Sequence, residues 1–273
     1  MAHFSYGRVG ATTGCCEPAE PLAYTPSMSG HSKWSTIKRA KGATDAKRAA
    51  QFTKVSREIT IAARIGGPDP ASNPRLRLAM DKGRSLNMPN DNIKRAIERA
   101  AGLGQSDAYE EITYEGYGPG GVAVLVEAAT DNRNRTASDV RSLFTKAGGS
   151  LASSGAVAWQ FEARGIIECS GVLATVGEAA IEAGADDVDE DSGSVFVYAD
   201  PASIETVRAG LEAAGVSVKS AEASIVAKST IDVDADDARK NMKLIDALEE
   251  LDDVQRVTAN FELSPELFAE LTR

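Results

Sequence analysis

The residues best suited to chemistry are cations that surround a tryptophan near the N-terminus. The segment "SGHSKWSTIKRAK" (residues 29–41) carries Lys33, Lys38, Arg39 and Lys41 around Trp34. Lys and Arg contacts to phosphate supply most of the non-specific affinity of proteins for nucleic acid. Trp34 has two alternative roles, which the sequence leaves open. It can stack on a base, or it can anchor this arm against the helices that follow.

A second set of cations lies on a predicted helix over residues 44–65. Its apolar residues recur every three or four positions and mark one buried face: Phe52, Val55, Ile59 and Ala62. At 100° per residue, Lys47, Lys54, Arg57 and Arg64 fall on the opposite face, while Arg48 projects near the apolar side. We expect Lys47, Arg48, Lys54 and Arg57 to contact phosphates together with the arm.

A third cationic feature is "TDNRNRTASDVR" (residues 130–141), between a predicted strand and a predicted helix. Asn132, Asn134 or Thr136 can cap this helix, and free N–H groups at a helix N-terminus attract phosphate. Arg133 and Arg135 would add charge to such a contact. Plain capping with solvated arginines is an equally good interpretation.

The division of charge along the chain supports a polyanionic partner. The net charge is −10, but residues 28–105 hold 16 Lys+Arg and 6 Asp+Glu, which gives +10. Residues 106–273 hold 13 Lys+Arg and 32 Asp+Glu, which gives a net charge of −19. This asymmetry points to nucleic acid as the partner of the basic part. The alternative is a basic domain that docks only on its acidic neighbour.

The sequence lacks the motifs of metal sites, catalytic triads and nucleotide-binding loops. There is no His beyond His31, no Cys-x-x-Cys spacing, and no acidic loop with the EF-hand ligand order. Gly116, Gly118 and Gly121 formally satisfy G-x-G-x-x-G, but they precede a strand instead of opening a helix, so we expect a tight turn there. Three cysteines and no long apolar run indicate a reducing, cytoplasmic location. We therefore expect no enzyme, cofactor, metal, membrane contact or obligate small molecule.

The predicted elements form a helical part followed by an α+β part. Helices are expected over residues 44–65, 74–85 and 89–102. Beyond residue 110, strands are expected at 121–130, 156–170, 186–191, 194–200, 216–227, 229–233 and 254–263. Helices are expected at 135–149, 173–184, 201–214 and 236–250. Beyond residue 110, a set of two helices and roughly four strands therefore occurs twice. This composition is typical of split βαβ, ferredoxin-like units.

Several long blocks resemble the YebC/PmpR family. They include "MSGHSKWSTIKRAKGATDAKRAAQFTKVSREITIAAR", "SLNMPNDNIKRAI" and "LIDALEELDDVQRVTANFEL". The resemblance spans Met28–Leu263 and implies a basic helical domain (28–106) followed by two ferredoxin-like domains, one inserted in the other. The inserted domain would be 165–228, and the discontinuous one 107–164 plus 229–266. Residues 1–27 are then expected to be a disordered extension or a mis-assigned start.

The resemblance also implies function. Family members are described as DNA-binding transcriptional regulators, whereas relatives such as the mitochondrial translational activator of cytochrome c oxidase bind RNA or the ribosome. Our leading hypothesis is a non-enzymatic, cytoplasmic DNA-binding regulator of transcription. The alternative is a ribosome- or RNA-associated translation factor that uses the same cations. A third hypothesis, a small-molecule-sensing regulator, rests on fold analogy alone.

Overall fold

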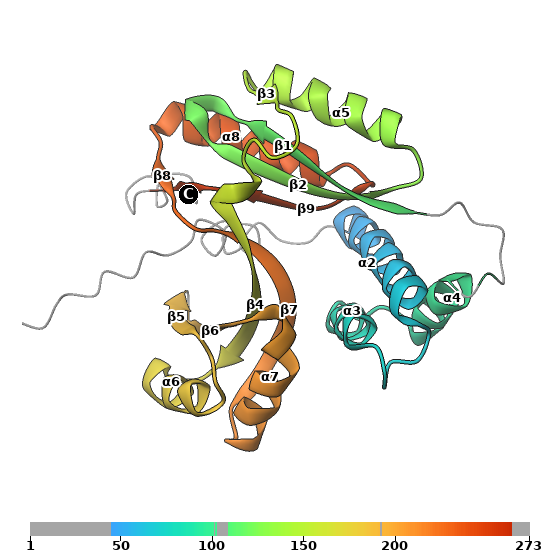
Figure 1. Ribbon diagram of the computed structural model, residues 1–273, viewed down its shortest axis with the longest axis vertical. Coiled ribbons are helices and arrows are strands. Elements are labelled where there is room, and N and C mark those ends of the chain that lie inside the picture. Colours follow the sequence, from blue (N-terminus) through green and yellow to red (C-terminus); the bar gives the residue numbers. More distant parts are fainter. Residues whose placement is uncertain (1–44, 101, 103–108, 192, 264–273) are drawn as a thin grey trace, which may run out of the picture.

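The computed structural model describes residues 45–100, 102, 109–191 and 193–263. These residues form three helices followed by two four-stranded antiparallel sheets, each covered by two helices (Figure 1). The predicted α+β class is therefore confirmed. Residues 1–27 and the basic arm at 29–41 lie outside the described residues.

The helical part consists of α2 (Asp45–Gly66), α3 (Pro74–Ser85) and α4 (Asn90–Ala100), close to the predicted ranges. Their small core includes the fully buried side chains of Ile59 and Leu76. Asn73 caps α3 by accepting from the Leu76 N–H at 3.0 Å. Its side-chain amide also donates to the Ala62 carbonyl at 2.9 Å, which holds α3 against α2.

The first sheet has the order β3-β1-β2-β9, and its helices α5 and α8 cover one face (Figure 1). Its members are β1 (Glu110–Tyr117), β2 (Ala123–Thr130), α5 (Arg133–Lys146), β3 (Ser150–Leu151), α8 (Ala235–Glu249) and β9 (Val254–Ala259). β2, α5 and β3 form a split βαβ unit in which β1 lies between the two strands. Phe144 and Leu248 are fully buried between the sheet and its helices.

The second sheet has the order β5-β6-β4-β7, which is the ferredoxin-like arrangement. Its members are β4 (Phe161–Ser170), α6 (Leu173–Glu182), β5 (Asp187–Asp191), β6 (Ser194–Ala199), α7 (Ile204–Ala213) and β7 (Ser217–Ala227). A short 3-10 helix, η3 (Pro201–Ser203), leads into α7. Gly165 allows α7 to approach β4, since a Cβ at this position would lie 2.3 Å from Cγ1 of Ile204.

A second apolar layer joins the two sheets. Alternate residues of β2 point away from α5 and α8, so Ala123 and Leu125 pack instead against Val157, Phe161 and Ala227. β4 runs without a break across the expected boundary between residues 164 and 165, because its first residues pair with the end of β7. The division of the chain into domains stays a prediction.

Three local expectations were wrong. The sequence predicted no strand at Glu110–Tyr117, where β1 forms. The expected strand start at 156–160 is instead a 3-10 helix, η2 (Ala158–Gln160), because the Glu115 carboxylate binds the N–H groups of Val157 and Ala158.

The third wrong expectation is the single last strand, which is split. After β9 the chain pairs as β10 (Phe261–Glu262) with β8 (Ile231–Asp232). The split occurs at Asn260, whose side chain accepts from the Ala123 N–H and donates to Gln160. The glycine-rich turn is confirmed: a 3-10 helix, η1 (Pro119–Gly121), connects β1 to β2.

Leu78 of α3 does not face the core of the helical part. It lies instead on the other side of α3, partly buried, and packs against the core of the second sheet. Leu76 and Ala79 fill the helical core in its place. A helix with two apolar faces thus joins two parts of the molecule.

Candidate nucleic-acid interface

The predicted cationic residues separate into three groups by position. Lys33, Trp34, Lys38, Arg39 and Lys41 lie outside the described residues. Lys47 and Arg48 occupy the first turns of α2, where the described side chains begin only at Ala49. Lys54, Arg57, Arg133 and Arg135 have described contacts.

Lys54 and Arg57 of α2 point toward the first sheet. The Lys54 ammonium donates to the Glu249 carbonyl at the end of α8, at 2.5 Å. Nη1 of Arg57 donates to the carbonyl of Asp252 at 2.5 Å and to Oδ1 of Asp253 at 3.0 Å. The Arg57 guanidinium also lies over the Tyr109 ring, 5.1 Å from its centroid. Both side chains therefore hold α2 to the first sheet, and their contact with phosphate stays a prediction.

Asp253 is the centre of this contact. Its Oδ2 accepts from Arg135 at 2.7 Å, Thr136 at 2.8 Å and Thr130 at 3.1 Å, while Oδ1 accepts from Arg57. The side chain is only 10% exposed. Burial raises the pKa of Asp253, but the hydrogen bonds from Arg135, Thr136 and Thr130 and the Arg57 charge outweigh it, so the pKa is lowered. One ionised carboxylate thus joins α2 to the N-terminal end of α5.

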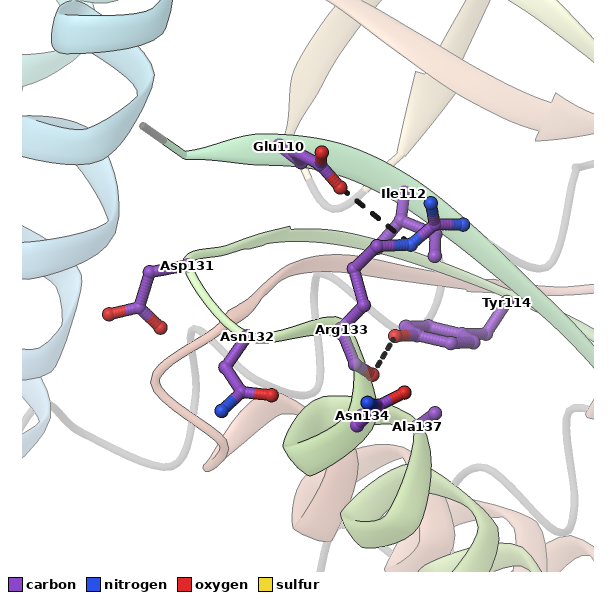
Figure 2. Close-up of a pocket in the computed structure, with 8 residues that line it drawn as sticks. All are labelled: Glu110, Ile112, Tyr114, Asp131, Asn132, Arg133, Asn134 and Ala137. Atoms are coloured by element: carbon purple, nitrogen blue, oxygen red, sulfur yellow. Dashed lines mark hydrogen bonds and ion pairs between the residues drawn. The ribbon is translucent and has the colours of Figure 1, made fainter. Parts of the chain in front are cut away.

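That end of α5 borders an open pocket (Figure 2). Asn132 caps the helix by accepting from the Arg135 N–H at 3.1 Å, so this predicted cap is confirmed. The Tyr114 hydroxyl donates to the Arg133 carbonyl at 3.2 Å and fixes the first turn against β1. Arg133 is the exposed cation of the pocket, with its side chain 64% accessible and 3.7 Å from Glu110.

The charge of this pocket is mixed. Arg133 and the first turn of α5 favour an anion. Glu110 and Asp131 line the same pocket and disfavour one. Arg135 does not line it, since its guanidinium is bound to Asp131 and Asp253. The structure therefore leaves Arg133 available to an anion and uses Arg135 internally, and phosphate contact by either stays a prediction.

Two exposed cations were missed by sequence reasoning. Lys94 and Arg95 lie on α4, where Ile93 and Ala96 face the core and turn them outward. Among the described residues, neither Lys94 nor Arg95 makes an ion pair. The helical periodicity of "NIKRAIERA" was sufficient to place them on the outer face. They belong to the exposed cationic surface of the helical part, as does Arg64 of α2.

A charged cluster fixes the helical part relative to both sheets. Lys82 of α3 lies 3.4 Å from Glu58 of α2 and 3.2 Å from Glu222 of β7. Arg256 of β9 binds the same Glu222 at 3.1 Å. Burial raises the pKa of the neighbouring Glu127 on β2. One junction therefore contains side chains from all three parts of the structure.

Two family descriptions match nearly the whole described chain. "TACO1/YebC protein N-terminal domain" matches residues 32–103, and "TACO1/YebC second and third domain" matches residues 109–261. The chain belongs to the TACO1/YebC family.

Curated members of the TACO1/YebC family are similar over most of their length. A "Probable transcriptional regulatory protein" of Rubrobacter xylanophilus is 55% identical over 250 residues, covering 89% of this chain and 99% of that protein. A protein of the same name from Trichlorobacter lovleyi is 52% identical over 239 residues, which cover 87% of this chain and 97% of that protein.

A solved structure has the same fold. The crystal structure of a conserved hypothetical protein from Aquifex aeolicus superposes with a TM-score of 0.76 at 47% identity, covering 81% of this chain and 92% of that one. The fold is therefore shared with an experimentally determined relative.

No helix of the described ranges is both long and apolar enough to cross a membrane. In the same part of the chain, no group of three or more His, Cys, Asp or Glu side chains is placed to hold a metal ion.

Proposed function

We propose that this chain is a non-enzymatic, cytoplasmic regulator of transcription that binds DNA through its helical domain. Relatives at 50–55% identity carry the name of probable transcriptional regulatory protein. The observation that carries the DNA-binding part is the outward placement of Lys94 and Arg95 on α4, in a segment whose net charge is +10. Cations that make no internal ion pair keep their charge for phosphate.

The internal contacts of α2 and α3 indicate which cations of the helical domain are left for DNA. Lys54, Arg57 and Lys82 are engaged inside the protein, so they orient the helical domain. The proposed phosphate contacts are therefore made by the remaining cations. They are Lys94 and Arg95 of α4 and the arm cations Lys33, Lys38, Arg39 and Lys41.

The test is equilibrium binding of a fluorescent duplex DNA over a range of salt concentrations. We expect log Kd to rise linearly with log salt concentration, and the Lys94→Ala/Arg95→Ala variant to bind more weakly with a slope reduced by about 2. Asp91→Asn is a control on the same helix that leaves both cations in place.

The same titration with single-stranded RNA separates the proposal from a translation factor. Tighter binding of RNA than of duplex DNA in one buffer would favour a role in translation. Binding of neither at low salt would refute the proposed function.

A further inference from the structure

Two aromatic side chains meet on the surface where the sheets join. Trp159 is 69% exposed and Tyr117 is 37% exposed. Nε1 of Trp159 and the hydroxyl of Tyr117 both donate to the carbonyl oxygen of Ala156, each at 3.1 Å. Their polar ends therefore meet at one acceptor, and both side chains leave aromatic surface in water on the same part of the molecule.

The loop that carries Trp159 is held by three hydrogen bonds to one carboxylate. The buried Glu115 carboxylate accepts from the N–H groups of Gly155 at 2.6 Å and of Val157 and Ala158 at 2.7 Å. Burial raises the pKa of Glu115, but these three backbone hydrogen bonds outweigh it and lower the pKa, so the carboxylate stays ionised. The indole is therefore presented by a rigid support and is not left exposed by a loose loop.

Lys228 supplies positive charge at the same place. Its backbone N–H donates to the Gln160 carbonyl at 2.8 Å, and its ammonium donates to the Trp159 carbonyl at 3.0 Å. An ammonium has three N–H donors, so two remain for a phosphate. The buried Glu115 carboxylate already accepts three N–H groups.

We propose that Trp159, Tyr117 and Lys228 form a stacking site for an unpaired base of single-stranded nucleic acid. Aromatic faces beside a cation are how proteins hold single strands without sequence preference, because every base has a π-face. The inference rests on the proposed function and extends it: bases in a duplex are already stacked, so this site requires an unpaired or opened strand. The site lies on the joined sheets, apart from the cations of α4.

The test uses tryptophan fluorescence. The chain has two tryptophans, so Trp34→Phe leaves Trp159 as the single indole and keeps a ring at position 34. This protein is titrated with a single-stranded thymidine oligonucleotide, with an abasic oligonucleotide of equal length, and with the corresponding duplex. We expect quenching that follows binding of the thymidine strand, and little quenching by the abasic strand or the duplex.

Affinity gives an independent measurement. Trp159→Ala is expected to weaken single-strand binding roughly tenfold, the scale of one stacked base, and to leave duplex binding unchanged. Ile181→Ser is the matched control, since Ile181 is also apolar and 74% exposed but lies on α6. Unchanged melting temperatures would show that both variants fold.

Two results would overturn the stacking site. One is equal quenching by the abasic and thymidine strands, and the other is a Trp159→Ala variant that binds the single strand as tightly as its parent. If the parent still binds duplex DNA in that case, the proposed function survives without the stacking site. A parent that binds no nucleic acid refutes both proposals together.

Discussion

Asp253 is predicted to be the side chain on which the docking of α2 depends most. Asp253→Asn keeps the shape of the side chain but removes its charge and replaces one acceptor oxygen with a donor. If the amide group takes the Oδ1 position, it faces Arg57, whose side chain is 14% exposed. If it takes the Oδ2 position, it faces Arg135, Thr136 and Thr130. Either orientation turns an amide donor toward an arginine donor, and Arg57 loses the carboxylate with which it pairs, whereas Arg135 keeps Asp131.

The expected loss in the free energy of unfolding follows from these contacts. Breaking a buried ion pair by changing one partner costs about 3–5 kcal/mol. Since Asn retains one acceptor and Arg135 is half exposed, we expect a loss near the lower end, about 3 kcal/mol. For a chain of this size that corresponds to a fall in melting temperature of about 6–12 °C. Thermal and urea unfolding, monitored by circular dichroism, measure the change in melting temperature and in the free energy of unfolding.

Asp252→Asn is the matched control. Asp252 is the preceding residue, its side chain is exposed, and only its backbone carbonyl binds Arg57. The same change in charge should therefore leave stability within about 0.5 kcal/mol. If Asp253→Asn were no more destabilising than Asp252→Asn, the reasoning that this carboxylate holds α2 to the first sheet would be refuted.

Three further predictions concern stability. Because the folded pKa values of Asp253 and Glu115 are lowered, their contribution is complete above the unfolded pKa of about 4 and is lost as the pH falls through the folded values. Urea midpoints from pH 7 to pH 3 should therefore fall, and less steeply in Asp253→Asn than in the parent. Glu115→Gln should cost about 2–4 kcal/mol, since at least one buried N–H loses its acceptor, and a denaturation midpoint equal to that of the parent would contradict this. Gly165→Ala should cost about 1–3 kcal/mol in unfolding experiments, because its Cβ would lie 2.3 Å from Ile204; Gly177→Ala, with open space around its Cβ, should not destabilise the protein.

The helices could be predicted from the sequence because their signals, apolar spacing and terminal residues, lie within each helix or next to it. The apolar spacing of Val55, Ile59 and Ala62 and the proline at residue 74 determine where α2 buries its face and where α3 begins. The strand β1 was missed because only its second half is buried, so its apolar content is low. Its partner β2 was found because it is buried on both faces and is almost continuously apolar.

The candidate site was predicted only in part, because the sequence gives the charge of a side chain and not its partner. Lys54 and Arg57 were expected to face solvent, since a helix with one cationic face usually does. In the structure the acidic loop at Asp252 and Asp253, nearly 200 residues away in sequence, meets that face. The two alternatives for the basic part are therefore not exclusive: some cations dock on the protein's own acidic neighbour, and Lys94 and Arg95 stay exposed.

The sequence by itself determined the α+β class, the family, the order of nearly all elements and the separation of positive from negative charge. These depend on composition and short-range periodicity, which a single chain displays without folding. Only the tertiary structure decided which cations are used internally, that one carboxylate joins α2 to α5, and that Trp159 and Tyr117 share an acceptor on the surface. Those outcomes depend on contacts between residues far apart in sequence, and no local pattern encodes them.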